Sequence, residues 1–174
     1  MADLDTTNIA QFKPAFLLHF EVTEEPVFIN SNESTTLIHA KIAKGYSKSL
    51  DEKYSFETEA LFGWDNVRIR AGRDSNIQDL DAQVFLKSKK NGGIIHLEYT
   101  GVSVNNEKSE AILKGGSESN SFTDAYITNH PKFTLDSKNT DEQWVQGRNF
   151  LGKGRHLRTE DGNFGIEYVV YVLE

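Results

Sequence analysis

Two carboxylates in one short segment are the first candidates for chemistry. Asp79 and Asp81 are two residues apart, so in an extended strand both side chains share one face, roughly 7 Å apart. Burial in an apolar interior raises the pKa of a carboxyl group, which then exchanges its proton near neutral pH. Asp81 lies within a regular apolar pattern, where aspartate is disfavoured by β-propensity. We therefore predict Asp81 as the catalytic acid or base; the alternative for each carboxylate is a salt bridge or a turn.

Six further residues are candidates for holding a substrate. They combine aromatic rings with polar groups and lie on or beside expected strands: Trp64, Asp65, His96, Tyr99, Tyr126 and Trp144. Aromatic rings bind flat hydrophobic molecules, and phenol hydroxyls add hydrogen bonds. The alternative is that the rings fill the core. Asp65, beside Trp64, is also a second candidate for acid–base chemistry.

Several other chemistries find no support in the sequence. The absence of cysteine excludes a thiolate nucleophile, a zinc finger and an iron–sulfur cluster. There is no Gly-x-Ser-x-Gly motif, and Gly152-Lys153-Gly154 lacks the further glycine and the helix of a nucleotide site. The pairs His19 with Glu21 and His96 with Glu98 would form a metal site only on neighbouring strands, and such alternation is commoner on exposed faces. We expect no metal and no cofactor.

Net charge and hydropathy limit the classes of partner that the protein is expected to bind. The 174 residues include 19 Lys and Arg against 26 Asp and Glu, which gives a formal net charge of −7. Nucleic-acid binders need a basic surface, so we expect no nucleic acid. The N-terminus has no secretory signal pattern, and no apolar run approaches the roughly 20 residues that cross a bilayer. We therefore expect a cytoplasmic protein that does not bind membranes. The sequence is compatible with a homodimer.

Short apolar segments with a period of two run through the sequence. They are 16–22, 37–42, 54–62, 67–71, 80–87, 94–102, 143–151 and 166–173, and 109–113 is short and suited to a helix. This alternation is typical of half-buried strands, and the lack of helix-length connections favours antiparallel pairing. We predict a single all-β domain over 14–174 after a loose arm at 1–13. Closure into an antiparallel, lipocalin-like barrel of about 8–10 strands hides the sheet edges; a two-sheet β-sandwich is the alternative.

One hairpin is specific enough to predict its register. Asn91-Gly92 suits a two-residue turn, which pairs Lys87 with His96 and Asp81 with Val102. One face then carries only apolar residues and glycine: Leu80, Ala82, Val84, Leu86, Ile95, Leu97, Tyr99 and Gly101. The favoured interpretation places this face in the core and the polar face in solvent. The other orientation makes the polar face a ligand-lined lumen, and the catalytic role of Asp81 requires it.

Several short motifs follow one another in a set order. They are Pro14–Val22, Phe62–Asn66, Gln78–Val84, Tyr99–Val102, Ala125-Tyr126, Pro131–Thr134, Trp144–Gln146, Phe150–Gly154 and Tyr168–Tyr171. This order resembles a family of small bacterial and fungal proteins classed as a domain of unknown function. The resemblance implies a lipocalin-like, or calycin-like, β-barrel of about 150 residues, here over Pro14–Leu173. Because some fungal members are found among natural-product pathway enzymes, it also implies small-molecule chemistry in secondary metabolism without a cofactor.

Together these features favour a small-molecule-binding barrel. We expect a cofactor-independent isomerase, cyclase or lyase that acts on a hydrophobic or aromatic substrate, with catalysis from orientation and a dry site. A carrier that binds a small apolar ligand without chemistry is the first alternative. An oligomeric interaction module with a fully packed barrel is the second.

Overall fold

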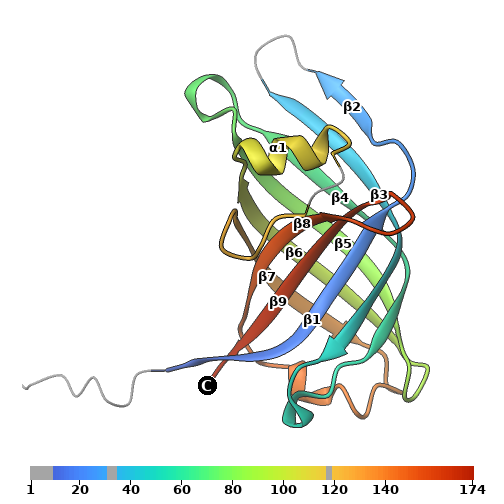
Figure 1. The fold of residues 1–174 in the computed structure, drawn as a ribbon. Helices are drawn as coiled ribbons and strands as arrows, with labels where there is room; N and C mark the ends of the chain where they lie inside the picture. The colour runs from blue at the N-terminus through green and yellow to red at the C-terminus, as the bar shows by residue number, and fades with distance from the viewer. Residues whose placement is uncertain (1–9, 31–34, 117–118) are drawn as a thin grey trace, which may run out of the picture.

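The computed structural model describes residues 10–30, 35–116 and 119–174, and most of them form β-strands (Figure 1). The strands are β1 (Phe12–Val22), β2 (Val27–Asn30), β3 (Thr36–Ser49), β4 (Thr58–Ile69), β5 (Ile77–Ser88), β6 (Ile94–Val104), β7 (Tyr126–Leu135), β8 (Phe150–Arg158) and β9 (Phe164–Leu173). The connections hold the helix α1 (Glu107–Leu113) and the 3-10 helices η2 (Glu52–Tyr54), η3 (Gly72–Asp74) and η4 (Gln143–Val145).

Eight of the strands close into an antiparallel barrel, which confirms the predicted fold class. From β3 to β9 each strand pairs with the next along the chain, and β1 completes the circle by pairing with both β9 and β3. β3 is shared, because its second half pairs with β1 while Thr36–His39 pair with β2. β2 is therefore an extra strand, and its residues Val27, Phe28 and Ile29 are 57%, 56% and 57% exposed.

The β5–β6 hairpin has a different register from the predicted one. Phe85, and not Lys87, pairs with His96, because Ser88 faces Gly93 across a longer loop over residues 89–92. Gly92 takes φ +70° in this loop, a conformation that glycine adopts without strain. The slip is two residues, so each side chain stays on its predicted face. The apolar face is buried in the core; the alternative, a polar lumen, is wrong.

Other elements differ from the predicted segments. The expected strands 54–62 and 67–71 are one strand, β4, and most of 143–151 is η4 and a connection. β7 was not predicted. The helix expected at 109–113 is α1. β1 begins at Phe12, within the expected arm, whose residues 1–9 lie outside the described part of the chain.

An aromatic cluster fills the end of the barrel that lies lowest in Figure 1. Phe16 stacks on Phe56 with ring centroids 4.5 Å apart, and Phe133 packs edge-on against Phe56 at 5.1 Å. Trp144 on η4 packs against Phe16 at 6.1 Å, and its indole N–H donates to the carbonyl of Ser55 at 2.8 Å. Buried apolar area stabilises the fold, so this aromatic plug closes one end of the barrel and fixes its strands.

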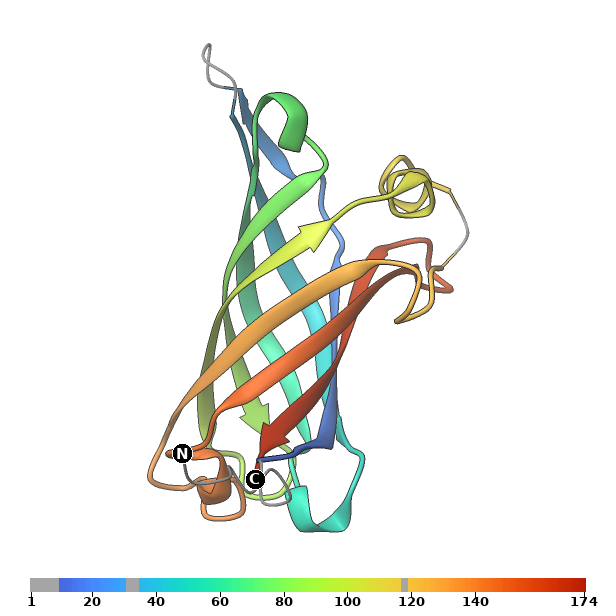
Figure 2. The same cartoon turned by 90° about the vertical axis from the view of Figure 1, so that its left-hand side faces the viewer.

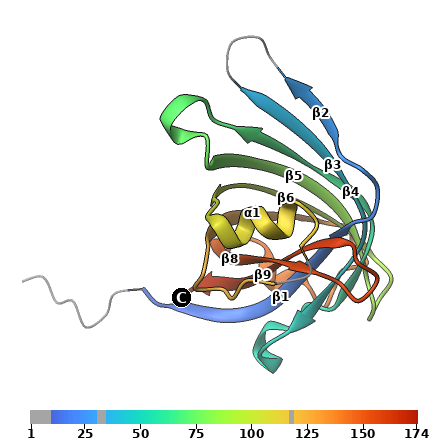
Figure 3. The same cartoon turned by 45° about the horizontal axis from the view of Figure 1, so that its top comes forward.

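The opposite end is uneven. β3 to β5 extend beyond β7 to β9 there (Figure 2), and α1 lies at this end next to β8 (Figure 3). Asn120 connects the two elements, because its amide N–H donates to Ser109 of α1 and its side-chain oxygen accepts from the backbone N–H of His156. Arg158 of β8 also donates to the carbonyl of Ile112, at the end of α1. We call this end the α1 end.

Candidate functional site

A carboxyl group lies inside the barrel. On β4 the residues Gly63, Asp65 and Val67 face inward by alternation, and Asp65 is only 8% exposed. Its partners on the neighbouring strands are Ala40 and Ala82, whose small side chains leave room beside the carboxylate. Aspartate is almost never buried unless it is paired, so this position calls for a physical explanation.

Asp65 has hydrogen-bond donors but no cation. Its Oδ2 accepts from the hydroxyl of Tyr99 at 3.3 Å, and its Oδ1 accepts from the backbone N–H of Asp81 at 3.2 Å. Within the described residues no Lys, Arg or His forms an ion pair with it. Burial raises the pKa of the carboxyl to about 6, although both hydrogen bonds act to lower it. The group therefore changes its charge near neutral pH.

A second tyrosine, Tyr168, lies beside Tyr99. The rings of Tyr99 and Tyr168 meet edge-on with centroids 5.6 Å apart, and burial raises the pKa of both phenols well above the usual range. The buried hydroxyl of Tyr168 lies near enough to Tyr99 for each phenol to influence the pKa of the other, but it forms no hydrogen bond of good geometry with the described residues. Gly154 provides the space for this ring, since a Cβ at that position would lie 2.7 Å from Cε1 of Tyr168.

Two more inward side chains carry polar atoms that the described chain does not satisfy. Both the oxygen and the nitrogen of the Asn129 amide are buried without a partner, and so is Nδ1 of His156. Burial lowers the pKa of His156 to about 4, so this imidazole is neutral at pH 7. Buried polar groups normally have partners, because an unmet one costs about 1–3 kcal/mol. Together with Tyr168, they form a set of buried polar groups that the described residues do not fully satisfy.

Inward-facing side chains become more exposed towards the α1 end. Val84 and Leu97, on the side of the aromatic plug, have no accessible surface, whereas Asp65 keeps 8%. Beyond it, Val67 and Ile166 are half-buried although they also face inward. Inward side chains near the α1 end are therefore less completely buried than those beside the aromatic plug.

Comparisons with known proteins agree with this description of the fold. The family described as "Protein of unknown function (DUF3237)" matches the sequence over residues 10–173. The chain belongs to the DUF3237 family. The resemblance indicated by the sequence motifs is thereby confirmed. No curated protein matches the sequence.

Several solved structures are similar in fold to this DUF3237 protein. A conserved protein of unknown function from Rhodopseudomonas palustris shares 15% identity at a TM-score of 0.77, covering 97% of this chain and all of its own. A protein from Acinetobacter baumannii, described as β-barrel-like, shares 14% sequence identity at a TM-score of 0.70, and the match covers 95% of this chain and 97% of that protein. A protein from Penicillium herquei, described as an enzyme, shares 10% sequence identity at a TM-score of 0.57, and the match covers 95% of this chain and 94% of that protein. At these identities the likeness concerns the fold alone.

The DUF3237 barrel brings together only two of the predicted site residues, Asp65 and Tyr99. Asp81 is exposed on the outer face, so the inward orientation that its catalytic role requires is wrong. Successive side chains of a strand point to opposite faces of the sheet, and Asp81 lies between the inward-facing residues Leu80 and Ala82, so its side chain points outward. Asn129 was missed, although the glycine opposite it, Gly152, was a readable signal of crowding; Tyr168, an aromatic residue of an expected strand, lies opposite Gly154 in the same way.

The remaining predicted residues lie elsewhere. Trp64 is half-buried on the outer face, and His96 stacks there on Phe85 with ring centroids 4.8 Å apart. Tyr126 is 59% exposed, with the Lys153 amine 5.3 Å from its ring. Trp144 belongs to the aromatic plug.

The histidine–glutamate pairs noted in the sequence do not assemble into a metal site in the described part of the chain. Within residues 10–30, 35–116 and 119–174, no three His, Asp or Glu side chains are placed to hold a metal ion. His19 instead contacts Glu167 at 3.1 Å and Glu21 at 3.3 Å, and Arg155 pairs with Glu167 at 2.6 Å. Burial acts to lower the pKa of His19, but the two glutamates more than offset it and raise that pKa.

No helix of the described chain is both long and apolar enough to cross a membrane.

Proposed function

We propose that this DUF3237 protein binds a small, largely apolar or aromatic molecule inside the α1 end and moves a proton on it, with Asp65 as the acid or base. One observation carries the proposal: the Asp65 carboxyl is buried without a cation and hydrogen-bonded to Tyr99. Burying an ionisable group in this way costs stability, and such strain is concentrated at functional sites. The description of the Penicillium herquei neighbour as an enzyme is compatible with catalysis on this fold.

The proposed chemistry follows from the groups present. With a pKa of about 6, Asp65 is mostly carboxylate at pH 7 and can take a proton from a carbon or hydroxyl of the substrate. The protonated carboxyl then returns that proton to another substrate atom, which balances an isomerisation, a cyclisation or an elimination without an external reactant. Tyr99 holds the carboxyl in place, while the hydroxyl of Tyr168 and the amide of Asn129 bind a substrate oxygen.

Proton exchange tests this function without knowledge of the natural substrate. In D2O, wild-type protein is expected to accelerate deuterium incorporation into 2-tetralone, an apolar bicyclic ketone with acidic C–H bonds, as followed by NMR. Asp65→Asn keeps the size of the side chain but removes its exchangeable proton, and should lower this rate by about 10²–10⁴-fold. Asp81→Asn is the matched control on the outer face and should leave the rate unchanged.

Binding is measured in parallel. Tyr168→Phe removes a buried hydroxyl that makes no hydrogen bond of good geometry with the described residues, so it should not lower the melting temperature while it weakens 2-tetralone binding several-fold. Equal exchange rates for wild type and Asp65→Asn would refute the role of Asp65. Binding without any exchange in the wild type would instead establish a carrier.

A further inference from the structure

A second feature lies on the side of the barrel, where β7 and β8 barely join. Their pairing is limited to Thr128 with Lys153 and Asn129 with Gly152. By contrast, β7 pairs with β6 along its whole length, from Tyr126 to Leu135. The remainder of β7 therefore separates from the start of β8. We call the opening between them the seam.

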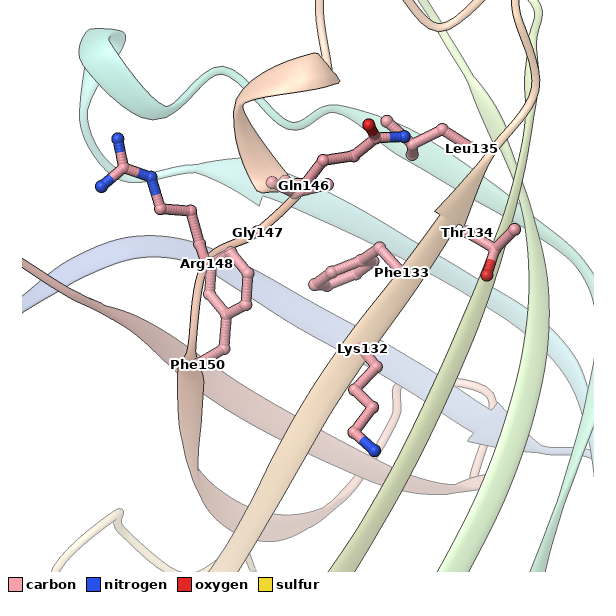
Figure 4. Close-up of a pocket in the computed structure, with 9 residues that line it drawn as sticks. Lys132, Phe133, Thr134, Leu135, Gln146, Gly147, Arg148 and Phe150 are labelled. Atoms are coloured by element: carbon pink, nitrogen blue, oxygen red, sulfur yellow. The ribbon is translucent and has the colours of Figure 1, made fainter.

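A pocket of about 420 Å³ occupies the seam. Figure 4 shows Phe133 of β7 and Phe150 of β8 side by side in its lining, and their rings meet edge-on with centroids 5.3 Å apart. Leu135 and Val145 add apolar wall, and Gln146 lies at the rim. A second hollow of about 270 Å³ shares Lys132, Arg148 and Phe150 with it, so the two form one groove. This volume suits a small ligand with an apolar body.

Two cations border this apolar wall. Lys132 lies on β7 next to Phe133, and Arg148 precedes Phe150 at the start of β8 (Figure 4). Both side chains are exposed, and neither has an ion-pair or hydrogen-bond partner in the part of the chain that the structure describes. Glu98 lies opposite Lys132 on β6, yet no ion pair joins them. In a chain of net charge −7, this is a local concentration of unpaired positive charge beside aromatic rings.

We propose that the seam is a second ligand site, which takes a small aromatic carboxylate. The aromatic body packs against Phe133 and Phe150 and the carboxylate pairs with Arg148, while Lys132, whose amine points to the other side of the opening in Figure 4, adds positive charge. A guanidinium donates two parallel hydrogen bonds to a carboxylate, so Arg148 fixes the orientation of the ligand. The site is separate from the interior carboxyl: Asp65 would repel this ligand, whereas the seam attracts it.

The probe is 2-naphthoate, and its uncharged analogue 2-naphthamide has the same aromatic body. Calorimetry at low salt should show 2-naphthoate binding at least tenfold more tightly than 2-naphthamide. The double variant Lys132→Gln/Arg148→Gln should reduce 2-naphthoate binding to the level of the amide. The control Lys48→Gln/Arg73→Gln removes the same charge from exposed positions elsewhere and should change little. Added salt should weaken 2-naphthoate binding to wild type.

Two further variants locate the probe. Gln146→Trp introduces a ring at the exposed rim of the pocket and should abolish binding of both compounds without lowering the melting temperature. Asp65→Asn should leave 2-naphthoate affinity unchanged, because that carboxyl belongs to the interior site. Equal affinities for the acid and the amide, or an equal loss in the control pair, would overturn the proposal. Tighter binding of 2-naphthoate to Asp65→Asn would place the probe in the interior and also overturn it.

Discussion

Asp65→Asn is expected to raise the free energy of unfolding by about 3 kcal/mol at pH 7, although it removes a charged residue from the centre of the protein. In the folded state the pKa of Asp65 is about 6, against 3.8 for an exposed aspartate. Between these values the unfolded chain releases the proton more readily than the folded chain. This group therefore destabilises the fold progressively as pH rises from about 4 to 6. Asparagine does not ionise, and its side chain can accept from Asp81 N–H and donate to Tyr99.

Urea unfolding of wild type and Asp65→Asn from pH 4 to 7.5 measures this effect. The difference between the two proteins should be below about 1 kcal/mol at pH 4 and approach its full value above pH 6. Asp81→Asn makes the same chemical change on the exposed face and should show no such difference in stability. A pH-independent difference for Asp65→Asn would contradict the raised pKa, and a destabilised variant would show that the folded state compensates the buried carboxylate.

Phe56→Ala should lower the free energy of unfolding by about 3–5 kcal/mol, as expected for truncation of a buried phenylalanine. Phe56 has no accessible surface and packs against Phe16 and Phe133 in the aromatic plug. Phe62→Ala is the control: Phe62 is 51% exposed on the outer face and stacks on Phe85, so its loss should cost about 1 kcal/mol. Equal losses in urea unfolding would show that the plug is not what holds this end closed.

The sequence predicts the barrel because alternation determines which face of a strand is buried. In the β5–β6 hairpin this holds even though the predicted register is off by two residues, since a slip of two changes no face. Alternation fails where apolar residues do something else. Trp144 and Val145 resemble part of a strand but belong to η4 and cover the plug. β7 escaped prediction because Asn129, His130 and Pro131 interrupt its apolar pattern.

The site was harder to predict, because burial of a polar residue leaves no apolar signature. On β4 the outward residues Phe62 and Trp64 are aromatic and the inward residues Gly63 and Asp65 are not, which reverses the usual pattern. Hydropathy along this strand therefore misplaces the interior. Asp81 had the clearer pattern around it, but that pattern places its carboxylate outside. The contact between Asp65 and Tyr99 joins residues 34 positions apart and depends on the shared orientation of two strands.

A closed barrel exposes no strand edge, but β2 gives this one an edge again. Within the described chain β2 pairs with β3 alone, and Val27, Phe28 and Ile29 present apolar side chains on both faces. Unpaired N–H and C=O groups beside exposed apolar residues are a template on which another chain can add a strand. The protein should therefore lose colloidal stability as its concentration rises, through β2 rather than through the barrel wall. Phe28→Lys would introduce the kind of charged edge residue that prevents such self-association, without touching either ligand site.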